Sequence, residues 1–198
     1  MTLDLLLGLV LFAFVTSITP GPNNMMLMAS GANFGIRRTM PHMLGVAIGF
    51  VVMALIVGAG LISIFDAYSI SHTILKEVSV IYLLWLAWKI GNAASIDGQG
   101  SAGKPITFLQ AAGFQWVNPK AWTMALTAIT AYAPGQTMSA IAGVALVFGL
   151  VNLPSVGSWA MIGQQMARFL TSPRRLVLFN RVMAGLLVAS LIPVVWPV

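Results

Sequence analysis

Two short segments combine prolines with side chains that can bind an anion, inside stretches that are otherwise apolar. They cover positions 19–24 and 118–120, and Pro22 and Pro119 are 97 positions apart. Both segments interrupt what would be membrane-spanning helices, and interrupted spans at matching positions are a pointer to a transport site. We therefore expect a substrate-binding site made by both segments, with the residues Pro20, Gly21, Pro22, Asn23, Asn24, Asn118, Pro119 and Lys120.

The expected chemistry of this site is the binding of a carboxylate. Proline breaks or kinks a helix, because it lacks an N–H donor and clashes with the preceding turn. A helix that restarts at Pro22 or Pro119 presents its first N–H groups and its positive dipole end, which favour an anion. Lys120 adds a full charge at the same depth, where a cation is costly and therefore a functional candidate. Two alternatives stay open: ordinary kinks for the prolines, and a lysine that reaches the interface from a tilted helix.

Other polar side chains in the apolar stretches are weaker candidates. Gln115, Trp122 and Asn152 form a second tier of substrate-binding residues, although the amides can instead join neighbouring helices. The chain has no cysteine, which excludes thiol redox chemistry and disulfides. No pair of carboxylates, Ser–His arrangement or cluster of metal-ligating side chains falls at mid-depth. We therefore expect no cofactor, no metal and no enzymatic activity.

The composition indicates which elements must position these residues. Of the 198 residues, 59% are hydrophobic and only 7% are charged, with a mean hydropathy of +0.92, against about 25% charged in a soluble domain. So apolar a surface is stable in lipid. The net charge of +6 does not come from a basic stripe along a helix, so it does not indicate binding to nucleic acid. A span needs about 20 apolar residues. We expect an all-α integral membrane protein with six transmembrane helices, at about 3–33, 41–64, 72–93, 106–131, 137–165 and 177–197.

The basic residues gather in alternate connections. Arg37 and Arg38 lie between the first two spans, Lys89 and Lys104 flank the third connection, and four arginines lie around the fifth. The positive-inside rule makes these connections cytoplasmic and places both termini outside. His42, at the cytoplasmic start of the second span, is expected at the interface, with a pH-sensing role as the alternative. The first segment lacks the basic start and cleavage site of a signal peptide, so we interpret it as a retained span.

The two halves of the chain resemble each other. Besides the prolines, the segments 45–50 and 143–148 share a Gly-Val-Ala start and a final Phe at an offset of 98. Three spans per half require the halves to lie in opposite orientations. We expect one domain over 1–198, made of two inverted three-helix repeats at about 1–96 and 103–198, with the first and fourth helices broken at the prolines. Gly45 and Gly49 have the spacing of a helix-packing pair, within one chain or in a homo-oligomer.

The same motifs resemble those of the LysE/RhtB family of amino-acid exporters, over essentially the whole chain. The Pro-Gly-Pro-Asn element is the most specific of them, and the segments 82–90 and 104–108 are also similar to the cysteine/O-acetylserine exporter branch. The fourth span departs from that branch by keeping Pro119 and Lys120. The resemblance rests on 19–24, Gly31, Gly35, Arg37, Gly45, Gly49, 82–89, 118–120, Asn180, Arg181 and Gly185.

The resemblance implies export of an amino acid or close derivative, driven by an ion gradient, usually of protons, across the bacterial inner membrane. Together with the broken spans it predicts a secondary active exporter that works by alternating access in the lipid bilayer. A channel or a non-transporting membrane subunit is the alternative. A channel should show a continuous polar pore, whereas polarity here gathers at two breaks.

Energy coupling has no assigned residue in the sequence. Asp4, Asp66, Glu77 and Asp97 all fall near span ends or in connections, and none is a convincing buried proton carrier. Lys120 itself, or the ionisation of the substrate, could carry the coupling.

Overall fold

The computed structural model describes residues 1–61, 70–93 and 103–195, and within these ranges every regular element is a helix. The expected all-α class is therefore confirmed. Asp66, Asp97 and the predicted span ends at 62–64 and 196–197 lie outside the described residues. The elements are α1 (Leu3–Ile18), α2 (Pro22–Ile56), a π-helical turn (Val57–Leu61), α4 (Ile70–Gly91), α5 (Phe108–Val117), α6 (Pro119–Tyr132), a 3-10 turn (Pro134–Gln136), α7 (Met138–Met166), α8 (Pro173–Ala189) and α9 (Ile192–Val195).

Prolines mark the starts of three helices. Pro22, Pro119 and Pro173 each occupy the first turn of their helix, where a missing N–H costs nothing because that group would have no helical partner. Between α1 and α2 the chain leaves the helical conformation at Thr19 and Gly21. Between α5 and α6 a single residue, Asn118, is extended, with φ −94° and ψ 107°. The helix boundaries therefore fall beside the candidate site residues.

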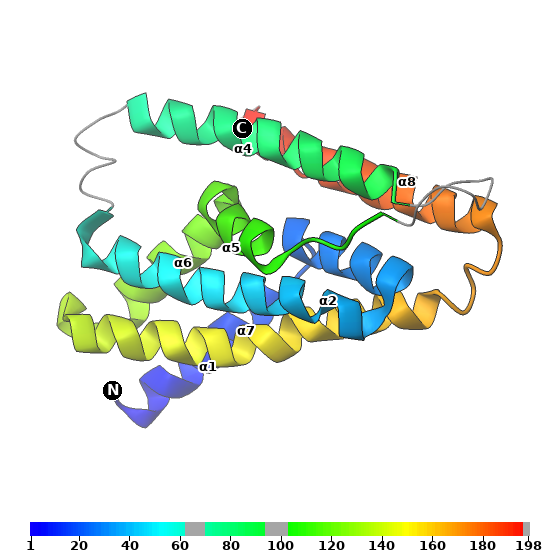
Figure 1. Ribbon diagram of the computed structural model, residues 1–198. Coiled ribbons are helices and arrows are strands. Elements are labelled where there is room, and N and C mark those ends of the chain that lie inside the picture. Colours follow the sequence, from blue (N-terminus) through cyan, green and yellow to red (C-terminus); the bar gives the residue numbers. More distant parts are fainter. Residues whose placement is uncertain (62–69, 94–102, 196–198) are drawn as a thin grey trace.

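A one-residue turn folds α2 back on itself at Gly35, whose φ of 74° and ψ of 164° suit glycine. The hydroxyls of Ser30 and Thr39 lie 2.9 Å apart, whereas a straight helix would separate them by about 13 Å. Figure 1 shows the two parts of α2 running in opposite directions. The connection expected at 34–40 is thus reduced to one residue, and Arg37 belongs to the first turn of the returning part.

The closest helix contact joins α2 to α7. A Cβ added at Gly31 would collide with the carbonyl of Ala160, and one added at Gly163 would collide with the carbonyl of Met28. Only glycine allows two backbones to approach this closely, which is how small residues serve membrane helices. α7 continues along the returning part of α2, so these two helices form the centre of the bundle.

The predicted packing role of Gly45 and Gly49 is confirmed. A Cβ at Gly45 would collide with the carbonyl of Phe108, and one at Gly49 would lie 2.6 Å from Cα of Ala112. These glycines hold α5 against the returning part of α2. Through this contact, α2 positions the broken α5–α6 segment beside α1.

Two segments of the described chain, Pro22–Gly60 and Met138–Met166, are long and apolar enough to cross a membrane, and α1 is a shorter apolar helix. Large apolar side chains such as Leu11 and Leu150 face outward, with 63% and 67% of their surface exposed. Figure 1 shows the turn of α2, the end of α4 and the α7–α8 connection at one end of the bundle. The start of α1 and the α6–α7 connection lie at the other end.

Two local expectations need correction. His42 is completely buried instead of interfacial, and neither imidazole nitrogen has a hydrogen-bond partner among the described residues. Its helix packs against α5 and α7 at this height, so the side chain faces protein and not the headgroups. The last span begins earlier than expected, at Pro173, because Ser172 accepts a hydrogen bond from Arg175 N and caps α8. It ends at Ala189, before the short α9.

Candidate functional site

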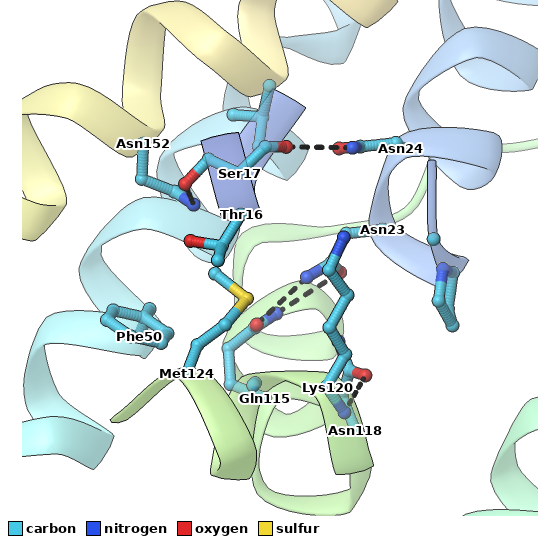
Figure 2. A pocket seen from close by; sticks show the side chains of 14 residues that line it. Thr16, Ser17, Asn23, Asn24, Phe50, Gln115, Asn118, Lys120, Met124 and Asn152 are labelled. Atoms are coloured by element: carbon cyan, nitrogen blue, oxygen red, sulfur yellow. Dashed lines mark hydrogen bonds between the residues drawn. The ribbon is translucent and has the colours of Figure 1, made fainter. Parts of the chain in front are cut away.

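A half-open cavity lies where the two interrupted segments meet, with about 340 Å³ of empty space that includes adjoining solvent. It is bounded by α1, both parts of α2, the α5–α6 break and α7 (Figure 2). The lining includes six of the eight first-tier candidates, namely Gly21, Pro22, Asn23, Asn24, Asn118 and Lys120.

The end of α1 is held by side chains from other helices. The amide of Asn24 donates to the carbonyls of Ser17 and Thr19, both at 2.8 Å, and the indole of Trp159 donates to that of Ile18 at 3.1 Å. The last carbonyls of a helix have no helical partner and need such donors when they are buried. The break after α1 is therefore stabilised by both α2 and α7.

Lys120 connects the two breaks directly. Its ammonium donates to the carbonyl of Thr19 at 2.7 Å and is 3.5 Å from that of Pro20. The side chain passes over Gly21, where an added Cβ would lie 3.0 Å from Cδ and 3.2 Å from Nζ of the lysine. A cation at the end of a helix is stabilised by the negative end of the dipole. Since an ammonium has three donors, these carbonyls leave it able to bind a ligand in the cavity.

The two helix starts at the site differ. Asn118 caps α6, since its side chain accepts from the N–H of Lys120 at 3.2 Å. At the start of α2, Gly21 occupies the capping position and no side chain of the described residues caps the helix. The first N–H groups of α2, on Asn23 and Asn24, are thus the ones left for an anion. Of the two helix starts, only that of α2 lacks a side-chain cap among the described residues.

A pair of side-chain amides crosses the site. Asn23 donates to Gln115 at 3.0 Å and accepts from it at 3.3 Å, and Gln115 also donates to the carbonyl of Ala111 at 2.8 Å. The pair links α2 to α5, 92 positions apart in the chain. Both amides therefore have partners in this structure, and either can exchange its partner for a ligand without losing hydrogen bonds overall.

Asn152, from α7, supplies an acceptor without a partner. Its amide nitrogen donates to the hydroxyl of Ser17 at 3.0 Å, while its Oδ1 has no hydrogen-bond partner among the described residues. The residue is 4% exposed and lines the cavity. A buried acceptor without a donor costs about 1–3 kcal/mol, so this oxygen is a strong candidate to bind a donor group of a ligand.

Three candidates lie outside the lining. Pro20 and Pro119 are exposed, so in this structure they shape the breaks and do not face the cavity. The indole of Trp122 is buried in an apolar cluster and donates to the carbonyl of Trp116 at 2.8 Å. Sequence reasoning missed Ser17 and Phe50. A short hydroxyl just before the Thr-Pro-Gly-Pro run was a usable signal for Ser17, whereas Phe50 was marked only as the end of the repeated segment 45–50.

The chemistry of the lining is that of a binding site. It combines one cation, an open helix start, several amides, the hydroxyls of Thr16 and Ser17, and the apolar side chains of Phe50, Met124 and Val156. Figure 2 shows Phe50 apart from the paired amides of Asn23 and Gln115. No acidic side chain lines the cavity, and the described part of the chain has no group of three or more potential metal ligands. A small molecule with a carboxylate suits this set.

Comparisons with known proteins agree with this description. Residues 14–194 match the family model described as LysE type translocator. The chain is 29% identical over 198 residues to a cysteine/O-acetylserine efflux protein of Klebsiella pneumoniae subsp. pneumoniae, covering 98% of this chain and 99% of the relative. Proteins with the same description are similar in Salmonella choleraesuis (31%, 79% and 81% covered) and in Escherichia coli strain K12 (28%, 95% and 96% covered). No solved structure is significantly similar.

Proposed function

The chain belongs to the LysE type translocator family, and on this premise we propose that it exports an amino acid or amino-acid derivative across the cytoplasmic membrane as a secondary active transporter. It is a membrane transporter and not an enzyme. The observation that carries the proposal is the cavity at the two helix breaks, where a cation and an uncapped helix start lie together. The relatives' descriptions make cysteine and O-acetylserine the first substrates to test.

In the proposed complex, the carboxylate of the substrate binds between Lys120 and the first N–H groups of α2. Three features support this placement: the spare donors of the ammonium, the missing cap at Gly21, and the absence of an acidic side chain from the lining. Asn118 orients α6, on which Lys120 lies, by capping it. Asn23 and Gln115 then lie beside the carboxylate as further donors.

The α-ammonium group of the substrate binds Oδ1 of Asn152. This oxygen is a buried acceptor in the same cavity, on the opposite helix α7. The cation and the helix start bind the carboxylate of the substrate, and the neutral acceptor binds its ammonium group. Such a site prefers a zwitterion to a simple organic acid, which has no ammonium group. The apolar side chains of Phe50 and Met124 leave the substrate's side chain a mostly apolar environment, which suits small uncharged side chains.

The chain as a whole forms one transmembrane domain of six spans, with inverted repeats at about 1–96 and 103–198. In this proposal α1 with the first part of α2 makes the first span and α5 with α6 the fourth, each broken at its prolines. Contacts between the halves support a shared site, since Lys120 binds the carbonyl of Thr19 and Asn23 pairs with Gln115. Alternating access then moves the halves relative to each other around the cavity.

The proposed orientation places the basic end of the bundle in the cytoplasm and both termini outside. The turn of α2, the end of α4 and the α7–α8 connection lie together at that end (Figure 1), and they carry or adjoin the basic residues of the chain other than Lys76 and Lys120. Export into a more acidic exterior is driven by proton entry. Asp4 and Glu77, the acidic residues that the structure describes, do not line the cavity, so the proton carrier is sought elsewhere.

The test is counterflow in liposomes that contain the purified protein. Vesicles are loaded with each of the twenty amino acids or O-acetylserine, and uptake of the labelled compound is followed with and without a pH gradient. We expect saturable counterflow of a small neutral amino acid or its derivative, and accumulation against its gradient when a pH gradient is imposed.

Two outcomes contradict the proposal. Flux that does not saturate and shows no counterflow would indicate a channel. The absence of transport for every compound, in vesicles whose protein is folded by circular dichroism, would refute the exporter function itself. Saturable counterflow without a response to pH would remove only the proton coupling.

A further inference from the structure

A second half-open cavity lies at the basic end of the bundle, with about 300 Å³ of empty space that includes adjoining solvent. Its walls are the first part of α2, the end of α4 and the segment that precedes α5. None of its lining residues belongs to the cavity at the helix breaks. The polar members of its lining are Ser30, Asn33, Lys89 and Lys104.

Two ammonium groups give this second cavity its chemical character. Lys89 donates to the side-chain carbonyl of Gln110 at 3.1 Å and lies over the ring of Trp85 at 5.5 Å, and both partners are neutral. Of the acidic residues that the structure describes, Glu77 lies twelve positions earlier on the same helix, about 18 Å away, and the start of α1 lies at the opposite end of the bundle (Figure 1). Two cations without a described counter-charge favour an anion between them.

The remaining polar groups of the lining are already satisfied and form a fixed wall. Asn33 donates to Asn180 at 2.6 Å and accepts from it at 2.9 Å, and the hydroxyl of Ser30 lies 2.9 Å from that of Thr39. These bonds tie the wall to α8 and to the returning part of α2. A ligand in this cavity therefore meets the two lysines as its free hydrogen-bond donors.

The two cavities lie in series along one short helix. The first part of α2 contributes Asn23 to the cavity at the breaks and Asn33 to the second cavity, and ten residues of helix span about 15 Å. The second cavity is nearer the end of the bundle that the basic residues mark as cytoplasmic. The second cavity therefore lies on the cytoplasmic side of the cavity at the breaks in the proposed orientation.

We propose that the second cavity is a cytoplasmic loading site, in which Lys89 and Lys104 bind the carboxylate of the substrate before it moves along α2 to the breaks. This inference rests on the proposed export function and adds a site on the path to it. The shared chemistry is that of an oxyanion, so the phosphate of an anionic lipid is the other source that the experiment must separate.

Binding is tested with one cysteine placed in the second cavity. The chain has no cysteine, so Ala93→Cys, at a position that lines this cavity, reports access through its rate of labelling by a thiol reagent in proteoliposomes. We expect O-acetylserine to slow labelling at least threefold and its methyl ester, which lacks the carboxylate, to leave it unchanged. The protection should disappear when Lys89→Gln and Lys104→Gln are added and persist when Lys76→Gln is added instead.

The lipid alternative is tested in the same proteoliposomes. Vesicles of phosphatidylcholine alone are compared with vesicles that contain phosphatidylglycerol. Labelling that slows with phosphatidylglycerol and ignores O-acetylserine would show a lipid site and overturn the proposal. Protection by O-acetylserine that survives the loss of both lysines would overturn it as well.

The loading site and the export function are tested separately by measuring the half-saturating substrate concentration on the cytoplasmic side and on the outer side of the membrane. With both lysines replaced by glutamine, we expect the half-saturating concentration on the cytoplasmic side to rise at least about tenfold, the lower end of the effect of one charged hydrogen bond, and that on the outer side to stay within about twofold. Equal changes on both sides, or none, would refute the loading site while the unaltered protein still transports. Absence of transport by the unaltered protein would refute the export function instead.

Discussion

Replacing Lys120 with methionine separates the two roles that the structure gives this side chain. The methylene chain over Gly21 is nearly preserved, while the bond to the carbonyl of Thr19 at 2.7 Å and any bond to the substrate are lost. Thr19 keeps the bond from Asn24 at 2.8 Å, so its carbonyl is not left without a donor. The free energy of unfolding should therefore fall by only about 1 kcal/mol.

The loss of substrate affinity should be larger. A hydrogen bond between a charged donor and a charged acceptor contributes about 1.5–3 kcal/mol, which corresponds to a roughly 10- to 150-fold rise in the half-saturating concentration. Counterflow in proteoliposomes measures this concentration, and thermal unfolding in detergent measures stability. Lys120→Met should thus lose much affinity and little stability.

Trp159→Phe is the control for the loss of a cap. It removes the indole N–H and with it the bond to the carbonyl of Ile18 at 3.1 Å, at a cost of about 1 kcal/mol of stability, and the smaller ring adds a cost for lost packing. Trp159 does not line the cavity, so affinity should not change. If Lys120→Met raises the half-saturating concentration no more than Trp159→Phe does, the lysine only caps α1 and the carboxylate role is refuted.

Three further predictions concern the fold and its orientation. Gly163→Ala forces a Cβ against the carbonyl of Met28 and should lower the unfolding midpoint by the equivalent of about 1–3 kcal/mol. Gly113→Ala is the control, because its Cβ meets nothing within 4 Å, and it should not lower the midpoint. Equal midpoints for the two variants would disprove the close contact. His42→Leu removes a buried ring without partners and should raise the free energy of unfolding by up to about 1–3 kcal/mol, so a lower midpoint would mean that the imidazole has a partner in solution. Ser139 lies at the start of α7 and Thr171 lies just beyond its other end. An impermeant thiol reagent should label Thr171→Cys from the cytoplasm and Ser139→Cys from outside. Labelling of both variants from one side would overturn the orientation.

The helical class and the site region could be predicted because their signals are local. Proline is favoured in the first turn of a helix, as at Pro22, Pro119 and Pro173, and a charge within a long apolar run is conspicuous in any sequence. The partners of the polar side chains could not be predicted. Asn24 and Asn118 both hold helix ends in the structure, and a sequence does not distinguish an amide that caps a helix from one that binds a ligand.

Contacts between residues far apart in the chain explain the other features of the structure that the sequence did not predict. Asn33 and Asn180 are 147 positions apart and bind each other, and no periodicity reports such a pair. The burial of His42 likewise depends on which face of α2 meets its neighbours, and its helix carries apolar residues on every face. The sharp turn at Gly35 depends on a single positive φ, which composition does not distinguish from the other glycines of the chain.

The two reciprocal amide pairs bear on how rapidly the halves of the protein can separate. Asn23 with Gln115 and Asn33 with Asn180 each join the first half to the second. A neutral amide bond contributes only about 0.5–1.5 kcal/mol, since water or another polar group can take its place. Separation therefore exchanges hydrogen-bond partners instead of exposing unpaired charges, and the activation barrier it adds is small. A carboxylate in the cavity at the breaks is itself an acceptable new partner for Asn23 and Gln115, so the solute can promote the separation of the halves at that point.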